Sequence, residues 1–244
     1  MFLSDEIIKN AIDNGWYTCH YQPKVEPSFE KVTGVEALFR LDIPGEGIVA
    51  PALFIERAIQ IGYEEQIFFI VLERSLQEIQ GLRRPLNLAI NITHNVIVNG
   101  SNLSRIKLLL EQYSFPAKRL ILELSESDEL SLKLSQHIDQ YKAVGVQISI
   151  DDFGSGYSNI NKVMSLPIDE LKFDKSLIDA TNKRASLLIK SIVKYCKEMG
   201  IKTVAEGVED AETRIFVRNL GFDSYQGFYY SRPVSVQELQ AASL

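Results

Sequence analysis

Residues 146–156 read Val-Gln-Ile-Ser-Ile-Asp-Asp-Phe-Gly-Ser-Gly, and the pattern in this stretch indicates the fold because it recurs along the chain. A short β-like run, Val146–Asp151, ends in two adjacent carboxylates, and a loop containing Gly154 and Gly156 follows it. The same arrangement recurs along the chain, because other β-like runs also end in or beside a polar residue suited to metal or phosphate chemistry. These polar residues are Gln22, Glu36, Asn91, Glu123, Asp151, Lys172, Glu206 and Gln226. A (β/α)8 barrel gathers its active site from the C-terminal ends of many strands, so the pattern predicts an α/β protein with a TIM-type barrel.

The predicted strands and helices alternate from the third strand onward, as such a barrel requires. Strands are expected at Trp16–Val25, Val32–Leu41, Leu86–Ile92, Leu120–Ser125, Val146–Asp151, Glu170–Phe173, Lys202–Ala205 and Tyr225–Tyr229. Helices are expected at residues 4–14, Pro51–Gly62, Glu64–Gly81, 102–113, Asp128–Val144, a short segment ending at Ser165, Lys183–Met199, Asp210–Leu220 and Val236–Ala242. We expect one domain over residues 1–244, with barrel strands from about residue 16 to residue 230.

The first two predicted strands break the regular pattern. About six residues separate Trp16–Val25 from Val32–Leu41, whereas a parallel crossover needs about ten to twelve. We therefore expect an antiparallel hairpin, which makes strand 1 antiparallel to the rest of the barrel. If the turn centres near Ser28-Phe29, Gln22 lies roughly level with Glu36 across the pair.

Composition limits the function classes. The chain has 244 residues, 45% of them hydrophobic, which suits one barrel with a large core. A net charge of −6 and a pI near 5.2 argue against a nucleic-acid polymer as partner, because phosphate binding favours a basic face. A small phosphorylated ligand needs only a local positive site and stays possible.

The cysteines and the N-terminus favour the cytoplasm. Cys19 and Cys196 are far apart in sequence and match no metal-binding spacing, so we interpret them as reduced thiols of a cytosolic protein. The acidic start of the chain contains no long apolar core typical of a signal peptide. No stretch approaches the ~18 apolar residues of a membrane span.

The polar residues at the strand ends indicate a metal site. Glu36, Asn91, Glu123 and Asp151 all offer oxygen ligands, and an all-oxygen set favours Mg²⁺ or Mn²⁺ over zinc. Asp152, adjacent to Asp151, can serve a second ion. Two metals about 3.5–4 Å apart suit phosphodiester hydrolysis, because they hold the attacking water and stabilise charge on the phosphate. A lysine at residue 172 could orient or deprotonate that water.

Taken together, the motifs resemble the EAL family of cyclic di-GMP phosphodiesterases. The family is named for the Glu-Ala-Leu tripeptide seen here at residues 36–38, and the resemblance extends from about Trp16 to Pro233. Glu-Ala-Leu alone is a common tripeptide, but seven motifs in order, each on the expected strand, are highly specific. The resemblance implies one EAL domain that opens cyclic di-GMP to linear pGpG.

The resemblance also assigns roles to residues. It implies metal ligands Glu36, Asn91, Glu123, Asp151, Asp152 and Glu206, with Asp151 bridging two ions, and a catalytic group of Lys172 with Glu36, Asp151, Asp152 and Glu206. It implies substrate contacts at Gln22, Leu38, Arg40, Asp174, Glu209 and Gln226. Glu126 is expected to hold the Asp152–Ser158 loop, beside the interface of a homodimer. A core-facing amide remains an alternative for Gln22, as does a plain surface base for Arg40.

Two other readings remain open. The first is a catalytically silent cyclic di-GMP receptor or protein-binding regulator on the same fold, and the second is a metal hydrolase acting on another phosphoester. Inactive members of the family usually lose the metal glutamate, the aspartate pair or the lysine, and this chain keeps Glu36, Asp151, Asp152 and Lys172. We therefore expect an active enzyme, with room for a regulatory partner.

Overall fold

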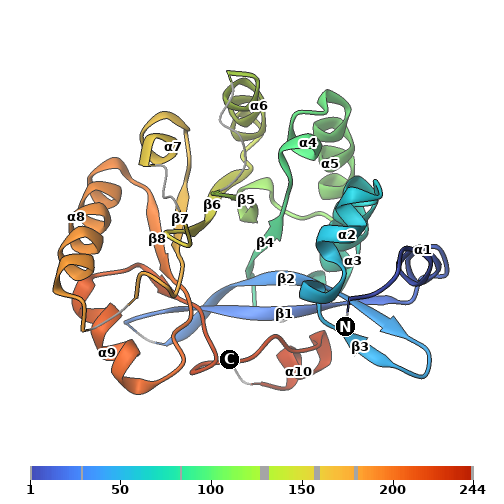
Figure 1. The fold of residues 1–244 in the computed structure, drawn as a ribbon. Helices are drawn as coiled ribbons and strands as arrows, with labels where there is room; N and C mark the ends of the chain where they lie inside the picture. Colours follow the sequence, from blue (N-terminus) through green and yellow to red (C-terminus); the bar gives the residue numbers. More distant parts are fainter. Residues whose placement is uncertain are drawn as a thin grey trace.

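A closed barrel forms the centre of the protein (Figure 1). The structure is a computed structural model that describes residues 2–28, 30–82, 84–126, 132–156, 160–178 and 181–242. Its strands are β1 (Tyr17–Glu26), β2 (Lys31–Ile43), β3 (Gly47–Val49), β4 (Asn87–Asn91), β5 (Leu120–Ser125), β6 (Gln147–Phe153), β7 (Glu170–Phe173), β8 (Lys202–Ala205) and β9 (Ser224–Tyr225). They follow the order β1-β9-β8-β7-β6-β5-β4-β2-β3, and pairing of β1 with β2 closes the ring. The predicted α/β barrel is confirmed.

Strand β1 runs antiparallel to both of its neighbours, β2 and β9, whereas the pairs from β2 through β4 to β9 are parallel. This confirms the hairpin expected from the short connection. Gln22 pairs with Glu36 across β1 and β2, as the predicted turn required. The short hairpin therefore brings the first two polar residues of the pattern side by side.

Helices surround the barrel (Figure 1). They are α1 (Asp5–Asp13), α2 (Ile55–Gln60), α3 (Glu64–Gln80), α4 (His94–Ile97), α5 (Gly100–Gln112), α6 (Leu132–Ala143), α7 (Ile160–Ser165), α8 (Lys183–Met199), α9 (Ala211–Leu220) and α10 (Val236–Ala241), with 3₁₀ turns at Pro51–Leu53 and Ala117–Arg119. Asn182 and Asp210 cap α8 and α9 with their side chains, and left-handed Gly200 and Gly221 end them. Among the described residues, no helix has both the length and the apolar character that crossing a membrane requires.

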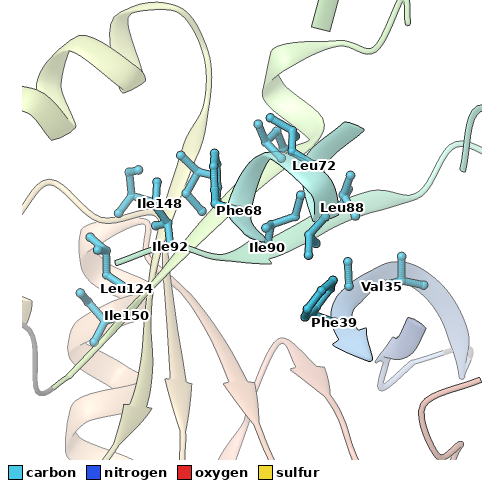
Figure 2. Close-up of a cluster of buried hydrophobic side chains, with 14 of the residues drawn as sticks. Val35, Phe39, Phe68, Leu72, Leu88, Ile90, Ile92, Leu124, Ile148 and Ile150 are labelled. Atoms are coloured by element: carbon cyan, nitrogen blue, oxygen red, sulfur yellow. The ribbon is translucent and has the colours of Figure 1, made fainter. Parts of the chain in front are cut away.

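Side chains along the barrel strands point alternately outward, toward the surrounding helices, and inward, toward the barrel interior. Leu88 and Ile90 of β4 are buried beneath α3, which contributes Phe68 and Leu72 to the same apolar cluster (Figure 2). The cluster continues over neighbouring strands through Val35, Phe39, Ile92, Leu124, Ile148 and Ile150. The residues between these apolar positions face the barrel interior, and they include the polar residues of the sequence pattern.

Most element boundaries differ from the prediction by one or two residues, and a few differ in a way that matters for the fold. The last strand ends at Tyr225 instead of Tyr229, because Gly227 packs so closely on the Val208 backbone that a Cβ there would lie 2.2 Å from the Val208 carbonyl oxygen. Beyond Leu41 the second strand continues to Ile43 and turns back as β3. Residues 51–62 form a 3₁₀ turn and α2 in place of one helix, and the helix expected at 102–113 begins at Gly100. The expected start of the Asp128 helix lies outside the described residues.

Candidate active site

The interior ends of neighbouring strands bring the predicted polar residues together. Lys172 of β7 is at the centre, with its side chain 1% exposed. Its Nζ lies 2.9 Å from Asp151 Oδ1 and 3.0 Å from Glu206 Oε1, and at longer range 3.3 Å from Glu123 Oε1 and 3.5 Å from Glu36 Oε2. One ammonium group thus connects carboxylates that come from β2, β5, β6 and the segment just after β8.

Amide side chains fix the Glu36 carboxylate. Asn91 Nδ2 donates to Glu36 Oε1 over 2.9 Å, and Gln226 Nε2 donates to Glu36 Oε2 over 2.6 Å. Gln226 Nε2 also reaches Gln22 Oε1 at 3.2 Å. Because both oxygens of Glu36 accept a hydrogen bond, its orientation is set before any ligand arrives.

Two overlapping groups of carboxylates offer ligand atoms that lie within 4.8 Å of one another. Glu36, Glu123 and Asp151 make the first group, and Asp151, Asp152 and Glu206 make the second. Asp151 belongs to both groups. All the donor atoms are oxygens, which suits a hard divalent cation such as Mg²⁺ or Mn²⁺.

One buried atom of the first group needs a partner. Glu123 Oε1 lies near two lysines, but Glu123 Oε2 is buried and has no hydrogen-bond partner among the described residues. Leaving a buried carboxylate oxygen unpaired is costly. A cation bound by the first group would give this oxygen a partner, so the residues present fit a metal ion.

Burial dominates the ionisation of the site. It raises the pKa of Glu123 to about 7 and that of Glu206 to about 8, because desolvation outweighs the nearby ammonium groups. Burial and the Asp151 carboxylate raise the pKa of Asp152 to about 6. The site therefore carries more carboxylates than its own cations can keep ionised, and a bound divalent cation would lower these pKa values.

Glu36 and Lys172 are shifted toward their charged forms. Burial opposes the ionisation of Glu36, but Lys172, Lys24 and the two amide donors hold its pKa below its ordinary value. Burial likewise favours neutral Lys172, yet the surrounding carboxylates raise its pKa well above its ordinary value. Without a bound cation, Lys172 is therefore an ammonium group that donates hydrogen bonds, and it is not a base.

Similarity to known proteins extends over nearly the whole chain. The EAL domain family model matches residues 5–233. The chain belongs to the EAL domain family. The bifunctional diguanylate cyclase/cyclic di-GMP phosphodiesterase MucR of Pseudomonas aeruginosa is 32% identical over 96% of this chain and 36% of MucR. The cyclic di-GMP phosphodiesterase RocR of the same species is 27% identical over 94% of this chain and 60% of RocR, so the chain spans only part of either relative.

A solved structure extends the likeness to three dimensions. A complex of the PaMucR phosphodiesterase with c-di-GMP, 32% identical to this chain, covers 96% of this chain and 98% of that one with a TM-score of 0.87. In this EAL domain, the tripeptide that names the family lies on β2, and its Glu36 faces the barrel interior beside Asn91.

The loop after β6 is held at its start. Asp152 adopts a left-handed conformation, with φ at 57°, and its N–H donates to Asp151 Oδ1 over 2.8 Å. The Gly154 N–H donates to Glu126 Oε2 over 2.9 Å, and the Glu126 N–H donates to the Asp151 carbonyl over 2.9 Å. Gly154 has φ at 99°, and a Cβ there would collide with Leu177. Tyr157 and Ser158, at the end of the predicted loop, lie outside the described residues.

Unlike the carboxylates around Lys172, four of the expected substrate contacts form no hydrogen bond or ion pair with it in the described part of the chain: Leu38, Arg40, Asp174 and Glu209. Leu38 and Arg40 follow Glu36 on the same face of β2, and both are half-buried. Half-buried Asp174 accepts a hydrogen bond from the Ser176 N–H, and exposed Glu209 lies 3.5 Å from Lys175. These four residues are near the C-terminal ends of β2, β7 and β8.

The EAL domain also contains polar interior residues that sequence reasoning missed. Lys24 is buried and lies 2.8 Å from Glu123 Oε1 and 2.7 Å from Glu170 Oε1. Ser149 lies beside Glu170 on the neighbouring strand. The period of two along a strand could have found them, because Lys24 follows Gln22 by two residues and Glu170 precedes Lys172 by two.

Proposed function

We propose that this EAL domain hydrolyses cyclic di-GMP to linear pGpG with two divalent metal ions, Mg²⁺ or Mn²⁺. The observation that carries the proposal is the pair of carboxylate groups that share Asp151, with Lys172 in contact with both groups. Support also comes from the relatives named as cyclic di-GMP phosphodiesterases and from the related complex with c-di-GMP.

The charge of the site supports two ions. Six carboxylates meet in or at the edge of the barrel interior, and the ammonium groups in contact with them are those of Lys24 and Lys172. The carboxylates are Glu36, Glu123, Asp151, Asp152, Glu170 and Glu206. Full ionisation would leave four negative charges, which two divalent cations would balance.

The first group of ligands would be Glu36, Asn91, Glu123 and Asp151, and the second would be Asp151, Asp152 and Glu206. When bound, the two ions would supply an activated water and offset the charge that develops on the phosphate. We expect little activity with Ca²⁺, because it prefers longer bonds and more ligands than Mg²⁺.

The protein's own residues would position the reactants. Lys172 contacts the carboxylates of both groups and would orient the attacking water. Asn91 and Gln226 keep Glu36 in place, and Gln22 supports Gln226. Arg40, four residues along β2 from Glu36, would hold a phosphate through its planar guanidinium.

The test is hydrolysis by the purified domain. Cyclic di-GMP is supplied with Mg²⁺, Mn²⁺, Ca²⁺ or EDTA, and the products are identified by chromatography against pGpG and GMP. The proposal expects pGpG with Mg²⁺ and Mn²⁺ and no product with EDTA. Binding of cyclic di-GMP without turnover at saturating Mg²⁺ would establish the silent receptor instead.

We also propose a homodimer in the cytoplasm, with the interface beside the loop that starts at Asp152. The segments on either side of β7 carry apolar side chains that are exposed in the single chain: Met164 is 59% exposed on α7, and Leu187 and Leu188 are 68% and 56% exposed on α8. An interface beside this loop would cover such exposed apolar side chains. Light scattering of the purified domain measures the mass, and a regulatory partner would compete for the same surface.

A further inference from the structure

A polar layer lies in the barrel interior at the level of Glu123, one of the predicted metal ligands. Glu123, Ser149 and Glu170 pair in register across β5, β6 and β7, so their side chains stand at the same level. Lys24 reaches them from β1, and its residue is 3% exposed. Bulky branched residues usually fill such layers, so this arrangement of buried charge requires an explanation.

The Lys24 ammonium joins the two acidic residues of this layer. Its Nζ lies 2.8 Å from Glu123 Oε1 and 2.7 Å from Glu170 Oε1. Lys172 approaches the same Glu123 oxygen at 3.3 Å, which makes Lys24 the nearer partner. The other oxygen, Glu123 Oε2, is buried and has no hydrogen-bond partner among the described residues. The contacts of Glu123 are thus concentrated on one oxygen.

We propose that Lys24, itself held by Glu170, is a positioning residue that directs Glu123 Oε2 toward the metal ion. This inference rests on the proposed function, since it assigns Glu123 to the first metal site. By holding Oε1, Lys24 prevents the carboxylate from turning its free oxygen toward Lys172. Lys172 then keeps its shorter contacts to Asp151 and Glu206, where the water would be oriented. Outer groups of this kind fix the geometry of metal ligands in many sites.

The alternative is that Lys24 only neutralises buried charge. The two readings predict opposite effects on metal binding. If Lys24 only supplies charge, its ammonium group repels Mg²⁺. Removing that ammonium group should then make Mg²⁺ bind more tightly. If Lys24 positions Glu123, its removal should weaken Mg²⁺ binding although the site becomes more negative.

The test compares metal affinities of four proteins by calorimetric titration with Mg²⁺ and with Mn²⁺. Wild type is compared with Lys24→Met, with Lys24→Met/Glu170→Gln, and with Asp223→Ala. Lys24→Met leaves the buried Glu170 carboxylate without its ion-pair partner, which could unfold the protein. The double variant also removes the charge of Glu170, so it should fold. Asp223 accepts two hydrogen bonds from Thr203, at the start of β8, and its loss weakens the fold without touching the metal ligands.

We expect the dissociation constant for Mg²⁺ to rise about 10–100-fold in both Lys24 variants. The double variant should recover thermal stability relative to Lys24→Met without recovering metal affinity. Asp223→Ala should lose stability and keep the wild-type dissociation constant. A folded double variant that binds Mg²⁺ as tightly as wild type, or more tightly, overturns the inference.

This experiment separates the inference from the proposed function. A wild-type domain that binds Mg²⁺ but does not hydrolyse cyclic di-GMP would contradict the proposed function, while the comparison of dissociation constants would still decide the role of Lys24. A wild-type domain that binds neither Mg²⁺ nor Mn²⁺ would overturn the inference as well.

Discussion

The two faces of the same barrel strands differ in chemistry near the candidate site. On β4 and β7, the outward residues Leu88, Ile90 and Leu171 are buried in the apolar core, whereas Asn91 and Lys172 face the interior and meet the acidic site. One residue along a strand separates a position in the apolar core from one in the candidate site. We therefore expect that stability and the proposed catalysis can be changed independently, which mutations on each face can test.

The largest contrast is expected between Glu36→Ala and Leu88→Ala. Glu36→Ala removes an interior carboxylate near Lys172, so turnover should fall on the order of 10³-fold or more, while the fold stays intact. Leu88→Ala should destabilise the fold by about 2–5 kcal/mol, since Leu88 is fully buried under α3, but the folded fraction should keep its turnover. Activity assays and chemical denaturation of both variants provide the measurements. An unfolded Glu36→Ala variant would reveal a structural role for the interior face.

A smaller effect, confined mainly to kcat, is expected for Lys172→Met. This substitution roughly keeps the length of the side chain and removes its charge. Orientation of the water is needed in the transition state, so kcat should fall about 100-fold or more while KM changes little. Steady-state kinetics at saturating Mg²⁺ separates the two constants. Unchanged kcat with a raised KM would make Lys172 a phosphate contact.

Removing the support of the loop should have an intermediate effect. Glu126→Ala deletes the carboxylate that accepts the Gly154 N–H, so activity and Mg²⁺ affinity should fall about 10–100-fold with every proposed metal ligand present. Hydrogen exchange should show faster opening of the loop. Exposed Glu198 on α8 serves as the matched control, because its side chain is 68% exposed and pairs weakly with Lys194. Equal values for Glu126→Ala and Glu198→Ala would remove the loop role.

The smallest effect concerns pH. The folded pKa of Glu206 is about 8, and its unfolded value is about 4.3. Because the folded state binds this proton more tightly, Glu206 contributes stability below its unfolded pKa, and that contribution is lost as the pH rises through 8. The metal-free domain should therefore lose about 1–3 kcal/mol of unfolding free energy between pH 6 and pH 8. Saturating Mg²⁺ should remove most of this slope, and a flat metal-free profile would contradict the raised pKa.

Sequence reasoning could predict the barrel and the positions of the strand-end residues, because turn lengths and the location of polar residues are local properties. The short hairpin predicted that Gln22 lies roughly level with Glu36, and a register shift between Lys24 and Val25 contributes to the observed pair.

Two kinds of feature escaped prediction. The early end of β9 depends on the approach of Gly227 to Val208, which are distant in sequence. The period of two could have placed Lys24 in the interior, but its partners Glu123 and Glu170 come from strands that β1 faces only across the closed barrel.

The central claim is that the interior face holds two metal ions that share Asp151. Anomalous diffraction from crystals of the domain soaked in Mn²⁺ measures this directly. The account predicts two manganese peaks, one against Glu36, Glu123 and Asp151, and the other against Asp151, Asp152 and Glu206. A single peak, or peaks away from Asp151, would contradict it.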